Sequence, residues 1–442
     1  MAVSAPRSRW ERALAATRPQ RSGVVKAVVG LGIEALGVPA AVGDRVRIET
    51  SGAREIDAEV VAVDGDAVRC MPMGPMSGIR VGAPVRHSGA ALRVPTGRAL
   101  LGRVLDGLGR PIDGRGPLVD ASLVSLANSA PSVIGRQRID RQLGLGVRAL
   151  DTMTPVGVGQ RLGLFAGSGV GKSSLLSMIA RGSTADATVI ALVGERGREV
   201  REFLEDDLGP EGLARAVVVV ATSDQPAMAR LRSAFVATRI AEQFRDDGLD
   251  VVLMMDSLTR VAMAQREIGL SAGEPPATRG YPPSTFSVLA GLLERAGTGS
   301  VGSITGLYTV LVDGDDHNEP VADAARGILD GHVVLDRALA VRGHFPAIDV
   351  LGSVSRVVSK VTTSEQRETA IVLRRVLAAR RQADDLIDIG AYKAGANPLV
   401  DAALAHRGAI DGFLTQRMDD LTATDDSWRR LAALTTTFGG LS

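Results

Sequence analysis

Apolar and polar residues alternate along residues 23–93 with the period of a β-strand. Short alternating runs at 24–29, 45–49, 59–63 and 67–70 are separated by turn residues, which predicts four strands. Asp64-Gly65 is a tight hairpin signal between the last two runs. Many short strands at even spacing favour a small β-barrel, in which Cys70 is most simply a barrel residue.

A second pattern extends from about residue 147 to residue 355. Wholly apolar runs at 162–166, 188–193, 216–221, 251–255 and 307–312 alternate with helical patterns. Strands that are apolar on both faces are typical of a buried parallel sheet, so this part is predicted to be an α/β domain. Residues 102–114 are dense in Gly, Asp and Pro, which predicts turns that link domains.

Strand patterns stop beyond about residue 365. A helix is predicted over 368–387, and mostly helical segments continue to the end, interrupted at 390–398. The chain therefore divides into an N-terminal segment (1–22), a β-barrel (23–93), an α/β domain (94–365) and a C-terminal helical domain (366–442). Within the first segment, Ser8 to Thr17 has the pattern of a short basic amphipathic helix, with a solvated, frayed terminus as the alternative.

Composition narrows the class of protein. A chain of 442 residues is too long for a single hydrophobic core, so two or three domains are expected. The 51 Lys and Arg against 50 Asp and Glu give a net charge of +1. That balance argues against a dedicated nucleic-acid binder. The single cysteine forms no internal disulfide, which fits a reducing cytosol. With no apolar run of about 20 residues and no secretion signal, we expect a soluble intracellular protein.

The most informative stretch is residues 161–180, where an apolar run is followed by a glycine-spaced loop and a helical pattern. The loop fits the phosphate-binding motif except that Ala166 replaces its first glycine. Lys172 is placed to contact the β- and γ-phosphates, and Ser173 to offer its hydroxyl to Mg²⁺. The alternative is a tight turn that binds no ligand, but such a turn does not require Gly-Lys-Ser at the start of a helix. We expect ATP and Mg²⁺ to bind here, with the nucleotide held by Gly167, Ser168, Gly169, Val170, Gly171, Lys172, Ser173 and Ser174.

Hydrolysis also needs a metal clamp, a group that positions water, and positive charge on the transition state. Asp256 ends an apolar strand in the form of a Walker B motif and is a candidate for the Mg²⁺ shell, although such a residue is often a cap. Glu195 follows another strand and can orient the attacking water, with Arg196 and Glu199 serving the phosphate and the metal's water shell. A solvated charged loop is the alternative. Arg356 is either a surface charge or an arginine finger for a neighbouring subunit.

Several longer motifs carry a family resemblance. Residues 165–173, 194–196 and 346–356 resemble the catalytic subunit of rotary ATP synthases. The runs at 256–260, 264–268, 273–283, 314–320, 328–332, 389–392 and 395–398 resemble more specifically the homohexameric ATPase of type III protein export, above all the flagellar one. The resemblance covers about residues 24–442, and Ala166 is common at its position in that family.

The resemblance implies a RecA-like phosphate-loop domain between the N-terminal β-barrel and the C-terminal helical domain. It makes Glu195 the catalytic glutamate, Arg196 a phosphate-contacting arginine, Arg356 the arginine finger, and Phe345 the ring that packs on adenine, with ordinary core as the alternative for Phe345. A chain that keeps Glu195, Lys172 and Arg356 together can build a ring of six identical active interfaces, which favours a homohexamer.

The same resemblance implies several partners. A stator-like regulator is expected at residues 1–22, and a coiled-coil stalk protein at the pore, where residues 390–398 are expected to face it. Export substrates, their chaperones and the export gate complete the set. The protein is then cytoplasmic and peripherally associated with the inner face of the cell membrane.

Three alternatives to a flagellar export ATPase share parts of this pattern. The injectisome ATPase shares most motifs, and the run at 97–117 favours the flagellar system. A hexameric nucleic-acid motor needs exposed aromatics in its barrel, and residues 23–93 contain no Phe, Tyr or Trp. A rotary synthase subunit is disfavoured by the export-specific runs around Gly273 and Gly390.

Overall fold

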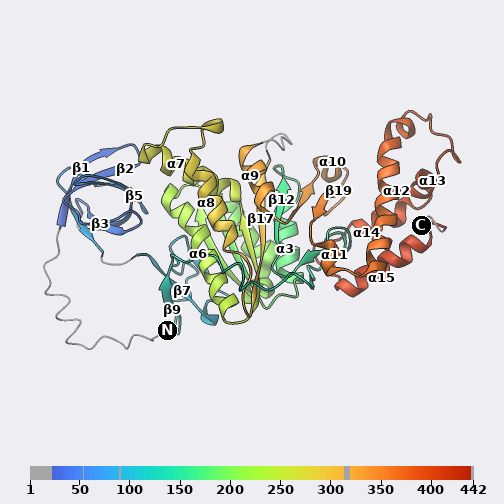
Figure 1. The fold of residues 1–442 in the computed structure, drawn as a ribbon, viewed down its shortest axis with the longest axis horizontal. Helices are drawn as coiled ribbons and strands as arrows, with labels where there is room; N and C mark the ends of the chain where they lie inside the picture. The colour runs from blue at the N-terminus through green and yellow to red at the C-terminus, as the bar shows by residue number, and fades with distance from the viewer. Residues whose placement is uncertain (1–21, 53, 89–90, 313–318, 440–442) are drawn as a thin grey trace. The chain divides into compact units, whose positions relative to one another are not determined.

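The computed structural model describes residues 22–52, 54–88, 91–312 and 319–439 (Figure 1). Its contacts form two compact units. The first ends at Leu92 and also contains Leu270–Glu274, and the second comprises Arg93–Gly269 and Pro275–Ser442. The predicted helix between Ser8 and Thr17 lies outside the described residues. The second unit continues through residue 365, so the predicted division at 365/366 stays a prediction.

The first unit is a closed antiparallel barrel with the strand order β1-β2-β5-β4-β3-β6. Side chains alternate between its interior and solvent, as the two-residue period predicts. The free thiol of Cys70 is buried inside, and this burial raises its pKa to about 12. The strands are β1 (Ser22–Val29), β2 (Gly32–Leu36), β3 (Arg45–Glu49), β4 (Glu55–Asp64), β5 (Ala67–Pro72) and β6 (Pro84–His87).

Two of these strands, β2 and β6, were missing from the predicted set. Only Gly30 and Leu31 separate β1 from β2, because Val29 pairs with Gly32. Gly30 has a φ of +57°, which a glycine adopts without strain. The predicted hairpin between β4 and β5 is present, with Gly65 and Asp66 as its two turn residues.

The second unit is built on a largely parallel sheet in the order β19-β18-β12-β17-β15-β13-β14-β8, with β16 paired to β17. Among the described strands of this sheet, only β19 and β16 run antiparallel to their neighbours. This confirms the predicted α/β class. The strands are β8 (Val104–Asp106), β12 (Arg161–Ala166), β13 (Ala187–Glu195), β14 (Ala216–Thr222), β15 (Asp250–Asp256), β16 (Gly297–Thr298), β17 (Ser303–Leu311), β18 (Gly331–Leu335) and β19 (Ile348–Ser355). Two small sheets pair β7 (Arg93–Thr96) with β9 (Ser122–Ser125) and β10 (Gln142–Leu143) with β11 (Val156–Gly157).

Strand β8 corrects the prediction that residues 102–114 only link domains. Its three residues pair in parallel with β14 at the edge of the main sheet. Leu105 is fully buried there, and the turn residues that follow return the chain to Ile112 beside Val104. A three-residue strand surrounded by Gly and Asp is too short to show a period, so its sequence indicated only the turns.

Helices pack on the faces of this sheet (Figure 1). The longest among those before residue 360, α6, packs on β13, β14 and β15 through small buried residues such as Ala234, Ala237 and Ala241. The helices are α2 (Arg148–Met153), α3 (Lys172–Gly182), α4 (Gly197–Glu202), η2 (Phe203–Leu208), α5 (Gly209–Ala214), α6 (Ala227–Asp246), α7 (Leu258–Ala272), α8 (Pro283–Glu294), α9 (Pro320–Ile328), α10 (Arg337–Val341) and α11 (Val358–Val361), with short 3₁₀ turns η1 (Arg98–Leu100) and η3 (Thr278–Gly280).

The C-terminal part is helical, as predicted. The long helix α12 (Ser364–Asp388) begins four residues before the predicted start because Thr363 and Gln366 form a capping box. Its partners are α13 (Pro398–Ala405), α14 (Arg407–Leu414) and α15 (Thr424–Thr436). No helix within the described residues is long and apolar enough to cross a bilayer.

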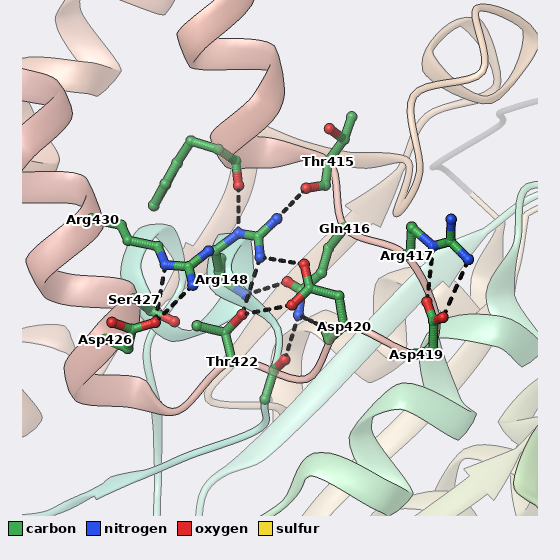
Figure 2. A network of polar contacts seen from close by, with 12 residues as sticks. Arg148, Thr415, Gln416, Arg417, Asp419, Asp420, Thr422, Asp426, Ser427 and Arg430 are labelled. Atoms are coloured by element: carbon green, nitrogen blue, oxygen red, sulfur yellow. Dashed lines mark hydrogen bonds and ion pairs between the residues drawn. The ribbon is translucent and has the colours of Figure 1, made fainter.

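A buried arginine ties these helices to the sheet (Figure 2). The Arg148 side chain at the start of α2 is 4% exposed and donates to the carbonyl oxygens of Phe413 and Thr415, to Asp420 and to Thr422. The Arg148 backbone N–H donates to Gln416 at 2.9 Å. Because a buried guanidinium needs many acceptors, the segment after α14 is folded around it.

Candidate active site

The phosphate-binding loop connects the end of β12 to the start of α3. Gly169 and Gly171 have φ angles of +77° and +85°, which other residues rarely adopt, so the spacing of the glycines follows from the backbone path. The loop opens into a cavity of about 560 Å³. The cavity is lined by Gly167, Ser168, Gly169, Gly171, Lys172, Ser173 and Ser174, among others. The side chain of Val170 is buried in the core instead, so only its backbone remains available to a ligand.

Two carboxylates share the ammonium group of Lys172. Its Nζ lies 2.6 Å from Oδ1 of Asp256 and 3.6 Å from Oε1 of Glu195. Burial lowers the pKa of Lys172, but Asp256 and Glu195 outweigh that effect and the net shift is upward. Thr309 at the end of β17 donates to the same Asp256 oxygen at 2.7 Å. The lysine therefore stays charged and is held in place where a phosphate would meet it.

The positions of these groups follow from the strand order. In the sheet, β15 lies between β17 and β13, and all three are parallel, so Asp256, Thr309 and Glu195 meet at the carboxyl edge. The phosphate-binding loop leaves β12 at the same edge. This is the crevice where open α/β sheets bind ligands.

Glu195 has the environment of a group that handles protons or water. Burial is the main cause that raises its pKa above the ordinary value, and the negative charge of Asp256 adds to it. Lys172 and Arg260 act in the opposite direction without cancelling the shift. A partly desolvated carboxylate beside a phosphate site is well placed to orient a water molecule.

Arg196 and Glu199 also line the cavity. Arg196 directly follows Glu195, and Glu199 lies in the first turn of α4. They pair with each other at 3.1 Å, and the Arg196 side chain is 77% exposed. In this structure Arg196 therefore lies at the rim of the cavity beside Glu199. The phosphate and metal roles expected of these two residues stay predictions.

Arg260 is a site residue to which sequence reasoning gave no role. It lies in the first turn of α7, four residues after Asp256, and its side chain lines the cavity. Its Nε is buried and has no hydrogen-bond partner among the described residues. A buried, unpaired guanidinium nitrogen beside a phosphate-binding loop can accept an anion. The spacing from Asp256 was the only available signal in the sequence.

Phe345 lies beside the phosphate-binding loop although 174 residues separate it from Gly171. A methyl group on Gly171 would lie 3.2 Å from Cδ1 of Phe345, so the ring and the loop are in contact range. The side chain is 44% exposed, which argues against the alternative that it is ordinary core. Its carbonyl oxygen accepts the N–H of Gln416 at 2.8 Å.

Arg356 is placed away from the other predicted site residues. It follows β19, which runs antiparallel to β18, and its N–H donates to the carbonyl oxygen of Asp330 at the amino edge of the sheet. Asp330 in turn donates to the carbonyl oxygen of Arg161, the first residue of β12. The length of β12, about 17–20 Å, therefore separates Arg356 from the phosphate-binding loop of the same chain.

The site also offers suitable ligands for a magnesium ion. Within the described ranges no three His, Cys, Asp or Glu residues gather as an all-protein metal site. Nucleotide-bound Mg²⁺ does not need one, because it takes one or two protein oxygens and completes its shell with phosphates and water. The exposed Ser173 at the start of α3, with Asp256 and Glu195 nearby, is a donor set of that kind.

The fold and site define a phosphate-loop nucleotide hydrolase with a RecA-like sheet, an N-terminal β-barrel and a C-terminal helical part. The family models agree with this class. They match residues 25–89 as the beta-barrel domain and 146–355 as the nucleotide-binding domain of the ATP synthase alpha/beta family, and 362–433 as the T3SS EscN ATPase C-terminal domain. The chain belongs to the family of flagellum-specific ATP synthases and type 3 secretion system ATPases.

Individual relatives match over almost their whole length. The flagellum-specific ATP synthase of Bacillus subtilis is 51% identical, covering 94% of this chain and 95% of that protein. The type 3 secretion system ATPase of Xanthomonas euvesicatoria is 47% identical, covering 94% of each. Among solved structures, the assembled ATPase EscN of enteropathogenic E. coli has a TM-score of 0.87 at 44% identity, covering 93% of this chain and 100% of that chain. EscN in complex with its central stalk EscO has a TM-score of 0.86.

Proposed function

We propose that this protein hydrolyses ATP to energise protein export through a type III secretion apparatus, and that the apparatus is the flagellar one. The observation that carries the activity is the cluster of Lys172, Asp256 and Glu195 at the phosphate-binding loop. The flagellar assignment is supported by identities of 50–51% to three flagellum-specific relatives, against 46–47% to two type 3 secretion ATPases. Two other flagellum-specific relatives are 45% identical, so the two groups overlap in identity. The injectisome is the alternative system.

In the proposed reaction, water attacks the γ-phosphorus of ATP, and the bond to the β-phosphate oxygen breaks to release ADP and inorganic phosphate. Glu195 orients the attacking water, and Lys172 compensates the charge on the phosphates. Arg260 and Arg196, which line the cavity, would contact the phosphoryl oxygens. Mg²⁺, when bound through Ser173 and Asp256 with Glu199 near its water shell, would neutralise phosphate charge. Phe345 would pack on the adenine ring.

We infer further that the active form is a homohexamer with one active site at each subunit interface. The support is the position of Arg356 at the amino edge of the sheet, a strand length from its own phosphate-binding loop. An arginine there is out of reach of its own site and would serve that of another copy. A head-to-tail interface of this kind closes into a ring when its repeated rotation completes a full turn.

The remaining partners belong to the same proposal. Residues 390–398 would contact a coiled-coil stalk at the pore of the ring. Export substrates and their chaperones would dock on the assembly, which lies at the cytoplasmic face of the membrane beside the export gate. The stator-like regulator would bind residues 1–22, of which 1–21 lie outside the described residues.

The test is the ATPase rate per subunit as a function of protein concentration, for the parent protein and for Glu195→Gln. We expect the parental rate to rise with concentration. We expect the variant to bind ATP normally but to hydrolyse it on the order of 100-fold more slowly or worse, because it loses the charge that orients water. A rate independent of concentration in a protein that stays monomeric would remove the ring. Activity that survives Glu195→Gln would remove that residue from catalysis.

A further inference from the structure

Two large apolar side chains project from a reverse turn in the second unit. The N–H of Gly135 donates to the carbonyl oxygen of Ser132 at 3.1 Å, which places Val133 and Ile134 at the two corner positions. Val133 is 87% exposed and Ile134 is 97% exposed. Such corners usually carry Gly, Pro, Asn, Asp or Ser. Two β-branched apolar residues there do nothing for the fold, and departures of this kind are expected at functional surfaces.

The turn is held rigidly at its base. The guanidinium of Arg136 donates to the carbonyl oxygens of Pro131 and Glu294, at 3.3 and 2.7 Å. Gln137 adds a backbone bond to Gly299 and a side-chain bond of 2.9 Å to the carbonyl oxygen of Ser300. An apolar contact that is already ordered loses little conformational entropy when it binds. The turn therefore has the properties of a preformed docking element.

The turn and Arg356 lie at the same edge of the sheet. Glu294 pairs with both Arg136 and Arg161, and Arg161 also pairs with Asp330, whose carbonyl oxygen accepts the N–H of Arg356. A continuous chain of ion pairs thus leads from the base of the turn to the backbone of Arg356.

Apolar contacts also place the turn next to the segment that contains Arg356. The side chains of Ile139 and Val357 converge on Gly157, where an added methyl group would lie 2.3 and 3.3 Å from them. Val357 is the residue directly after Arg356, and Ile139 follows the turn by a few positions. The two segments are therefore parts of one surface.

We propose that the Ser132–Gly135 turn is a contact between copies of this chain, in which Val133 and Ile134 dock on the neighbouring copy at the side of its phosphate-binding loop. The inference rests on the proposed ring, because Arg356 can reach a neighbour's phosphate only if the amino edge of the sheet faces that neighbour. An exposed apolar pair on the same edge is then covered on assembly. The turn would contribute to the affinity with which the neighbour binds, on the same surface as Arg356.

The experiment compares the parent with the double variant Val133→Ser, Ile134→Ser, and uses Val119→Ser, Leu123→Ser as the matched control. The control side chains are 69% and 55% exposed in the same unit. For each full-length protein, the ATPase rate per subunit and the molecular mass by sedimentation are measured against protein concentration. Urea unfolding checks that the fold is unchanged.

We expect the double variant to need at least a tenfold higher concentration for half-maximal rate. This change corresponds to a loss of about 1.4 kcal/mol of association free energy for each subunit that joins. Its rate at saturating concentration should equal that of the parent, since no group at the phosphate site is altered. The control should assemble like the parent. A double variant that assembles at the parental concentration would overturn the inference. If such a variant also lost export in cells, the turn would bind another partner and not a second copy. A parent whose mass stays that of a monomer at every concentration would instead refute the ring itself.

Discussion

Replacing Arg148 by methionine is expected to destabilise the second unit strongly. The substitution keeps the aliphatic volume but removes the guanidinium that is 4% exposed and donates to two backbone carbonyl oxygens, those of Phe413 and Thr415. A buried carbonyl oxygen left without its donor costs about 1–3 kcal/mol, and because only the bond to Phe413 is fully buried we expect about 3 kcal/mol for the two. Asp420 adds little to this figure, because 42% of its side chain is exposed and water replaces its lost partner.

The assay is urea unfolding followed by circular dichroism. With an m value of about 3 kcal/mol/M, the midpoint of the transition that includes the sheet should fall by about 1 M. The matched control is Arg417→Met, which removes the same group from the segment that Arg148 contacts (Figure 2). Arg417 pairs with Asp419, but both side chains are largely exposed, so the midpoint should stay at the parental value. Equal midpoints for the two variants would refute the view that Arg148 holds the C-terminal helices to the sheet.

Two further predictions concern assembly. Arg356→Ala should lower the rate at saturating protein concentration by about 10³-fold, because the transition state loses a positive charge, while ATP affinity at low concentration stays unchanged. A parental rate in the assembled variant would remove the arginine-finger assignment. Tyr392→Ala combined with Lys393→Ala should abolish stimulation by a coiled-coil stalk partner, because Tyr392 holds the 390–398 loop through Asn397 and Asp401. Unchanged stimulation, measured as phosphate release with and without the stalk protein, would show that the loop does not contact it.

Local sequence was sufficient to predict the phosphate-binding loop, because a strand, a glycine-spaced turn and a helix start are all defined within 20 residues. It also predicted Asp256 and Glu195 as strand-end carboxylates, and the structure brings both to Lys172. Short elements were missed for the same physical reason. Strands β6 and β8 are too brief to show a period, and β2, although as long as β3, does not alternate strictly between buried and exposed positions. Pairing with distant strands decides their conformation.

What the sequence by itself determined is the chemistry: a phosphate-binding loop with one lysine, two carboxylates at strand ends, and an arginine of undecided role. The tertiary structure decided which of these groups act together. Strand order brings Glu195 and Asp256 to one ammonium group and adds Thr309 and Arg260, whereas the reversed direction of β19 carries Arg356 to the opposite edge. The reason is physical. The chemical character of a side chain is local, but its neighbours depend on how strands far apart in the chain are ordered, and no local pattern records that order.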